Sequence, residues 1–122
     1  MSPTSGPLVH ELAIPAASDF IATTRLFVSG VAGIVTSDEE LVEDLKLAVS
    51  EIVTAIVEYG GIGVVTVTVA TGSSQLRVDV APWPSDIPGE PLGPLDIVDA
   101  LFPGAESADG VVRLVAILEG HA

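Results

Sequence analysis

The side chains that offer the most obvious chemistry are Glu51 and the two histidines, His10 and His121. Glu51 stands in a run of apolar and small residues, where an ionised carboxylate is unfavourable unless a partner stabilises it. It is either a functional carboxylate or a side chain at a helix edge that reaches solvent, and the residues alone leave both open. Neither histidine has a partner at an informative spacing, so a Ser-His-Asp triad and a histidine metal site are not expected. His10 is interpreted as an ordinary strand side chain.

The composition excludes several other classes of function. Four basic and seventeen acidic residues give a net charge of −13, which would repel a phosphate backbone, so nucleic-acid binding is not expected. The chain has no cysteine, so disulfides, thiolate zinc sites and thiol nucleophiles are impossible. The acidic cluster over residues 38–44 is interpreted as the solvated start of a helix, and no metal site is predicted there.

The hydrophobic pattern indicates which elements must position these residues. Alternation of apolar and polar residues predicts strands, and apolar residues spaced by three and four predict helices. The last apolar run, residues 111–118, is predicted to be a strand buried on both faces for part of its length. The predicted strands cover residues 8–14, 63–70, 76–81 and 111–118, and the predicted helices cover residues 18–33, 37–59 and 94–102.

Helix ends are predicted from capping residues. Ser18 is the expected N-cap of the first helix, with Gly30 and Gly33 fraying its far end. Ser37 and Glu40 form an expected capping box at the start of the second helix, which Gly60 and Gly61 would end.

The element order β-α-α-β-β-α-β predicts an α/β (α+β) two-layer sandwich. Its sheet is expected to be mixed and mostly antiparallel, with the helices on one face. A single domain over residues 8–122 follows a short flexible leader, residues 1–7. Residues 82–94 and 103–110 are expected to be loops. No basic leader precedes an apolar stretch, and no run reaches about 20 clean apolar residues, so a cytoplasmic protein without a membrane span is expected.

The segment LKLAVSEIVTAIVEYGG, residues 45–61, resembles the helix that carries the first nucleotide motif of histidine-kinase-like (Bergerat-fold, GHKL) ATPases. It is most similar to the bacterial anti-sigma factors that are also serine-protein kinases, which typically read L-x-L-A-V-S-E-x-V-T-N-A-V-x-H-G. The resemblance continues in order through the hairpin with LRVDV, a segment like G-L-x-I-V-x-A-L at residues 93–101, and the last strand. It implies the two-layer sandwich of that family.

The resemblance assigns nucleotide roles to two positions of the second helix. In the family, the motif glutamate orients the attacking nucleophile and the motif asparagine coordinates the Mg²⁺ that bridges the phosphates. Glu51 matches the first position, but Ala55 occupies the second, and the chain contains no asparagine. An alanine methyl cannot ligate a cation that demands oxygen donors.

Two further nucleotide motifs of the family are altered here. The adenine-binding D-x-G-x-G motif falls on APWPSD, residues 81–86, where only Asp86 offers a carboxylate, out of place. The phosphate-cradling G-x-G-L turn falls on residues 92–95, where Gly93 is the one glycine and Pro94 has no N–H to offer. The resemblance thus implies a vestigial site, with Glu51 in the position of the general base.

These departures favour a non-catalytic, pseudokinase-like regulator that binds proteins in a sigma-factor, partner-switching circuit and uses no ATP or Mg²⁺. The partners that the resemblance implies are a sigma factor, a STAS-type anti-anti-sigma protein and a second copy in a homodimer. The alternative is an active ATP-dependent serine-protein kinase that phosphorylates the STAS-type partner and has an unusual Mg²⁺ shell. A third hypothesis is an oligomerisation or scaffold domain. Trp83 is expected either to anchor an interface or, as the favoured alternative, to fold down into the vacated nucleotide pocket.

Overall fold

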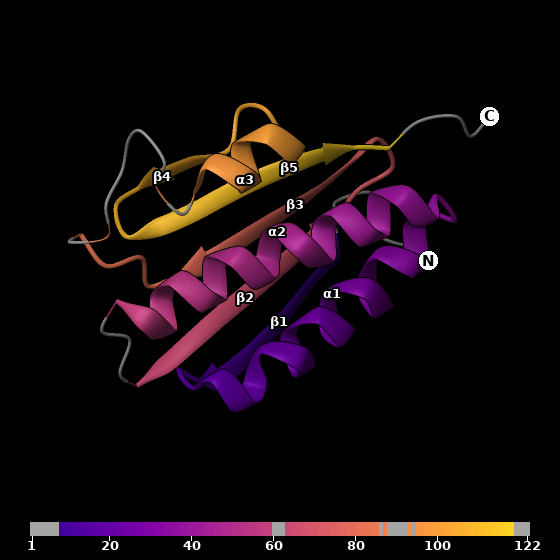
Figure 1. Ribbon diagram of the computed structural model, residues 1–122. Helices are drawn as coiled ribbons and strands as arrows, with labels where there is room; N and C mark the ends of the chain where they lie inside the picture. The colour runs from indigo at the N-terminus through magenta and orange to yellow at the C-terminus, as the bar shows by residue number, and fades with distance from the viewer. Residues whose placement is uncertain (1–7, 60–62, 86, 88–92, 94, 119–122) are drawn as a thin grey trace.

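The protein forms one antiparallel sheet with its helices on one face (Figure 1). The computed structural model describes residues 8–59, 63–85, 87, 93 and 95–118, so the predicted leader and Gly60–Gly61 lie outside the described residues. The five strands have the order β1-β2-β3-β5-β4. In chain order the elements are β1 Leu8–Pro15, the 3₁₀ turn η1 Ser18–Phe20, α1 Ile21–Val35, α2 Glu39–Glu58, β2 Val64–Thr71, β3 Gln75–Ala81, α3 Leu95–Leu101, β4 Glu106–Ala108 and β5 Val111–Ile117.

The predicted two-layer α/β sandwich is confirmed, with two differences in the sheet. Every pairing between the described strands is antiparallel, so the sheet is not mixed. The expected loop at residues 103–110 contains the short strand β4, which pairs with β5 through Ala108 and Val111. Asp109 and Gly110 between them both have a positive φ, 56° and 77°. An Asp-Gly pair with two positive φ angles is typical of a two-residue hairpin turn, so this dipeptide was the signal for β4.

The core lies between α2 and the inner face of the sheet. Residues three and four apart on α2 share one face, and they cover the strand positions that point toward the helices. Sheet residues two apart share a face in the same way. The core contains Leu45, Val49, Ile52, Val53 and Ile56 of α2, together with Val65, Val67, Val69, Leu76, Val78, Val80, Val112, Leu114 and Ala116 of the sheet.

Burial along β5 alternates, so the expectation that this strand is buried on both faces is wrong. Val112, Leu114 and Ala116 are buried, whereas Val115 and Ile117 are exposed. The physical reason is that the described helices all lie on one side of the sheet, which leaves the other side of β5 without a covering layer (Figure 1). Because the outward-pointing residues Val115 and Ile117 are also apolar, the sequence pattern of β5 resembles that of a strand buried on both faces.

The start of α1 differs from the prediction, because Ser18 opens the 3₁₀ turn η1 and is not the N-cap of the helix. Phe20 occupies the N-cap position of α1 without a side-chain capping bond, and the Thr24 hydroxyl donates to the Phe20 carbonyl at 3.2 Å. The helix also continues through Gly30 and Gly33 to Val35. Packing of α1 against α2 stabilises these turns and outweighs the low helix propensity of glycine.

By length and composition, one segment of the described chain, Ser18–Val35, is apolar enough to cross a membrane. The sequence analysis did not predict this segment, because polar residues and glycines interrupt its apolar run. Only 22% of this segment is buried. Three of its buried residues, Val28, Val31 and Ala32, belong to the core.

Asp38, and not Ser37, caps helix α2. The Asp38 carboxylate accepts hydrogen bonds from the backbone N–H groups of Glu40, at 3.1 Å, and Leu41, at 3.2 Å. The predicted capping box of Ser37 and Glu40 is therefore wrong, because the helix begins one residue later than expected. A carboxylate also suits this position electrostatically, since it lies at the positive end of the helix dipole.

Replacing Asp38 by alanine is expected to lower the free energy of unfolding by about 1 kcal/mol, because two backbone N–H groups lose their acceptor. Ser37→Ala is the matched control and should change stability little. Urea unfolding followed by circular dichroism measures both. Equal losses in the two variants would contradict the assignment of Asp38 as the cap.

Candidate functional site

Glu51 lies in the middle of α2, at the edge of its buried stripe. Its side chain is half-buried, while the next residue, Ile52, is completely buried. Ser50 and Thr54, on either side, are also half-buried. The carboxylate thus occupies the boundary between the core and solvent, where it remains in contact with water. This position agrees with the helix-edge interpretation, and it also leaves Glu51 accessible to a partner.

Ala55 follows Glu51 by one helical turn, which places the two side chains on neighbouring parts of the same helix surface. It is only 3% exposed, although it is not a member of the main core cluster. Its carbonyl accepts a hydrogen bond from the Tyr59 N–H at 2.9 Å, where α2 ends. The position that the resemblance compares with a metal-binding asparagine therefore presents a packed methyl group.

Gly93 lies directly before α3, and the structure places this helix against α2. Gly93 is buried, and its carbonyl accepts the N–H of Asp96 at 3.0 Å, so it forms the first turn of α3. Helix α2, which carries Glu51 and Ala55, and helix α3, which follows Gly93, are therefore neighbours (Figure 1). The other predicted nucleotide position, Asp86, lies outside the described residues.

Trp83 packs against the hydrophobic core and is half-buried. Its backbone N–H donates to the Gly110 carbonyl at 2.8 Å, which ties the segment after β3 to the turn between β4 and β5. The side chain therefore folds onto the protein, and the expectation that it fills a former nucleotide pocket stays a prediction. A fully exposed interface anchor does not agree with this packing.

The structure also accounts for His10 and for the acidic cluster. His10 is a strand residue of β1, as predicted, and its Nδ1 is buried without a hydrogen-bond partner among the described residues. In the acidic cluster, Asp38 caps α2 and Glu43 forms an exposed ion pair with Lys46 at 3.0 Å. The described residues contain no group of three or more histidine, aspartate or glutamate side chains that could hold a metal ion.

A charged cluster that the sequence analysis missed lies on the face of the sheet that points away from the helices. Arg113 of β5 donates to both carboxylate oxygens of Asp79 on β3, from Nε at 2.8 Å and from Nη2 at 3.2 Å. Arg77 of β3 approaches the same carboxylate at 3.7 Å. The hydrogen bond and the charge of Asp79 raise the pKa of Arg113 above its ordinary value, with a further contribution from Glu106. Alternation places Arg77 and Asp79 on one face, but only the pairing of β3 with β5 adds Arg113.

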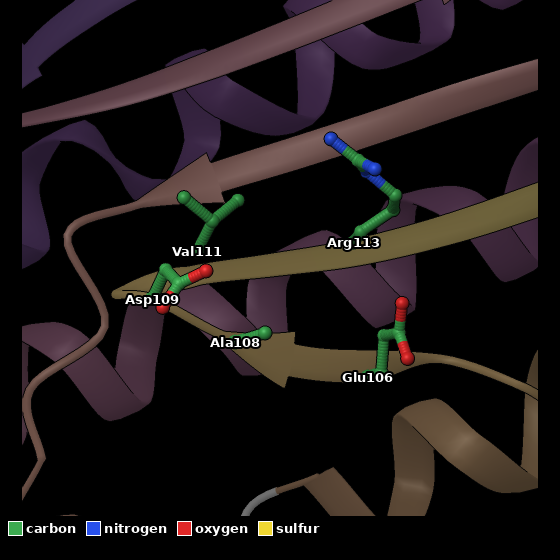
Figure 2. Close-up of a pocket in the computed structure, with 5 residues that line it drawn as sticks. All are labelled: Glu106, Ala108, Asp109, Val111 and Arg113. Carbon is green, nitrogen blue, oxygen red and sulfur yellow. The ribbon is translucent and has the colours of Figure 1, made fainter.

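Arg113 also borders a hollow of about 210 Å³ on one face of the paired strands β4 and β5. Figure 2 shows its lining, Glu106, Ala108, Asp109, Val111 and Arg113. Two other hollows lie near the start of α2, one lined by Thr36, Asp38, Glu40, Leu41, Asp44 and Ile117, and one lined by Ser29, Gly33, Thr36, Ser37, Glu39, Val42 and Glu43. None of these three hollows is lined by Glu51 or Ala55.

Comparison with curated proteins finds two partial relatives, both serine-protein kinases named RsbW. The chain is 38% identical to the serine-protein kinase RsbW of Halalkalibacterium halodurans over 53 residues, which is 43% of this chain and 33% of that protein. It is 32% identical to the serine-protein kinase RsbW of Bacillus cereus over 74 residues, which is 58% of this chain and 46% of that protein. The chain thus spans between a third and a half of the curated relatives it matches. No protein-family model matches it.

Proposed function

We propose that this protein is a non-catalytic relative of the anti-sigma-factor kinases that regulates transcription by binding proteins in a partner-switching circuit. The observation that carries the proposal is Ala55, a buried methyl group one turn after Glu51, where the kinases that the helix resembles place a metal-binding amide. The partial identity with two serine-protein kinases named RsbW supports the placement in this branch.

The donor set around Glu51 does not fit a magnesium-nucleotide complex. Mg²⁺ requires oxygen ligands in a near-octahedral arrangement, and it is held through carboxylates together with phosphates and water. Glu51 supplies one carboxylate on this stretch of α2, and Ala55 supplies no donor. Without the metal, the charge on a transferred phosphoryl group loses its main neutralising partner. We therefore derive no phosphoryl-transfer step for this chain and propose that it uses neither ATP nor Mg²⁺.

The proposed partners are a sigma factor and a STAS-type anti-anti-sigma protein, in the cytoplasm. The net charge of −13 favours rapid encounter with a partner that presents a basic face, and this attraction weakens as salt is added. Binding competition between the two partners would then perform the switching that the kinases of this branch couple to phosphorylation.

The test is a binding assay with the purified protein against the sigma factors and STAS proteins of the same genome, with and without Mg-ATP. We expect binding to at least one of them, with an affinity that changes by less than about twofold when Mg-ATP is added, because a ligand that does not bind cannot couple to a second site. Failure to bind any of these proteins would overturn the proposal.

The second candidate, an active serine-protein kinase, is favoured by Glu51 in the position of the base and by the partial identity with two serine-protein kinases named RsbW. The same mixtures with labelled ATP distinguish the two. Transfer of phosphate to the STAS protein that is lost in Glu51→Gln would establish the kinase and refute the non-catalytic proposal.

A further inference from the structure

The helical layer has a groove between α1 and the start of α2. It is one of the two hollows near the start of α2 described above, with a volume of about 440 Å³, and its walls include Ser29 and Gly33 of α1 and Glu39, Val42 and Glu43 of α2. This volume lies within the range of about 300–1,000 Å³ that is usual for binding pockets. We call this hollow the α1–α2 groove.

Small residues on α1 create the α1–α2 groove. Ser29 and Gly33 are one turn apart and share a face of the helix, and neither has a side chain that fills the space beside the half-buried Val42. A Cβ built at Gly33 has no packing neighbour within 4 Å. The Ser29 hydroxyl donates to the Leu26 carbonyl at 3.1 Å, so this polar group is already paired within α1. The α1 wall therefore leaves room for an apolar side chain from outside.

Exposed leucines continue both walls of the groove. Leu26 precedes Ser29 by three residues on α1 and is 72% exposed, and Leu47 follows Glu43 by four residues on α2 and is 44% exposed. Residues three and four apart lie on one face of a helix, so each leucine extends a row of groove residues. The short connection over residues 36–38 makes α1 and α2 antiparallel neighbours (Figure 1). The groove is thus acidic near this connection and apolar farther along the two helices.

The start of α2 carries more negative charge than its own helix requires. Residues 38–46 contain five acidic residues and one lysine. The positive end of the helix dipole offsets only about half a charge, and its effect is confined to the first turn. Glu43 lies in the second turn and remains 67% exposed although it pairs with Lys46 at 3.0 Å. Glu39 forms no ion pair within the part of the chain that the structure describes. Both carboxylates are therefore available to cations from outside.

We propose that the α1–α2 groove binds a basic amphipathic helix of a partner protein. Apolar side chains of that helix, spaced by three and four residues, enter the groove between Leu26 and Leu47. Its lysine or arginine side chains contact Glu39 and Glu43. Two packed helices that present an apolar groove commonly receive a third helix in this way. Charge complementarity selects a basic helix, because the same carboxylates repel an acidic one.

This inference rests on the proposed function only in that the occupant belongs to another protein. Glu51 and Ala55 do not line the α1–α2 groove. The groove is therefore a docking site separate from the position that the resemblance compares with a nucleotide site.

Fluorescence anisotropy with a synthetic peptide tests the proposal. The probe is a labelled peptide of leucine and lysine, about 18 residues or five turns long, with its leucines on one helical face. The control peptide has the same composition, with the leucines distributed around the helix. At about 0.15 M salt we expect saturable binding of the probe, at least about tenfold tighter than that of the control peptide. Absence of saturable binding would overturn the proposal, and so would equal affinity for the two peptides, since charge alone would then explain binding.

Gly33→Leu tests whether the groove is the site. The added side chain occupies the groove without a clash at its Cβ, and leucine favours a helix over glycine by about 1 kcal/mol, so the variant should remain folded. Gly30→Leu is the matched control, because Gly30 is also exposed and unobstructed but does not line the groove. We expect at least about tenfold weaker probe binding for Gly33→Leu and less than about twofold change for Gly30→Leu. Equal effects would contradict the proposed site.

Paired charge variants separate local contacts from attraction by the whole protein. Glu39→Gln combined with Glu43→Gln removes two charges beside the groove. Glu11→Gln combined with Glu58→Gln removes two exposed charges elsewhere and gives the same net charge. We expect at least about tenfold weaker probe binding for the first pair and less than about threefold for the second. Equal weakening would refute the groove as the contact for basic side chains.

An introduced cysteine locates the bound peptide independently, because the chain has none of its own. Ser37→Cys stands at the groove, and Ser107→Cys on the exposed strand β4 is the matched control. With a probe that carries one cysteine, we expect the disulfide to form at least about tenfold faster at Ser37→Cys. Comparable rates would refute the location. None of these measurements uses nucleotide or a sigma-circuit protein, so their failure is distinguishable from failure of the proposed function.

Discussion

Replacing Ile52 by alanine is expected to lower the free energy of unfolding by about 2–5 kcal/mol, the range for removal of a large buried aliphatic side chain. Ile52 is completely buried in the centre of α2, within the cluster that joins this helix to the sheet. The loss combines the transfer free energy of the missing carbons with the cost of the cavity that remains. Since small domains have total stabilities of only about 5–15 kcal/mol, this one change should remove a large part of the total.

The measurement is urea unfolding followed by far-ultraviolet circular dichroism. Leu47→Ala, on the same helix but 44% exposed, is the matched control and should cost less than about 1 kcal/mol. If both variants unfold at the same urea concentration, α2 does not pack on the sheet through the stripe described above.

Replacing Ala55 by asparagine is expected to destabilise the protein and not to restore nucleotide binding. Ala55 is 3% exposed, so the larger side chain must displace its neighbours and bury an amide, each of which typically costs about 1–3 kcal/mol. An asparagine at this position would recreate the metal-binding residue of the kinases that the helix resembles. The changed adenine and phosphate motifs at residues 81–86 and 92–95 would still be in place.

Thermal unfolding with and without Mg-ATP measures both effects. We expect a lower melting temperature for Ala55→Asn than for the control Thr54→Asn, at the half-buried position next to it, and no upward shift with nucleotide in either variant. A dose-dependent rise of the melting temperature in Ala55→Asn would contradict the proposal, because by mass action only a ligand that binds the folded state produces it. Such a rise would mean that the rest of a nucleotide site is present and that the Ala55 methyl group alone prevents nucleotide binding.

Most helices and strands could be predicted because their signals are local. The apolar stripe of α2 and the alternation in β2 and β3 each depend on residues close together in the chain. The errors occurred where two local signals competed. Asp38 and Ser37 are adjacent residues that can both cap a helix, and only the position of the first turn selects one of them. The short strand β4 was missed although Asp109–Gly110 is a hairpin signal, because its three residues carry no apolar alternation.

The candidate site was predictable only in part. The position of Glu51 one turn before Ala55 follows from helical geometry, and the missing asparagine is a fact of composition. Whether these side chains are buried does not follow from the residues, because it depends on which elements pack beside that edge of α2. The Arg113–Asp79 pair joins residues 34 positions apart, and no local pattern indicates that β3 and β5 are neighbours.

By itself, the amino-acid sequence determined the type of most elements and the apolar face of each, because these properties depend on backbone preferences and side-chain spacing within a few residues. It also determined that this chain cannot supply an asparagine or a thiolate ligand anywhere. Only the tertiary structure decided the strand order, the uncovered side of β5, the burial of Ala55 and the pairing of Asp79 with Arg113. These features depend on contacts between segments that are far apart in the sequence. Such contacts form only when the whole chain packs, so no local pattern predicts them.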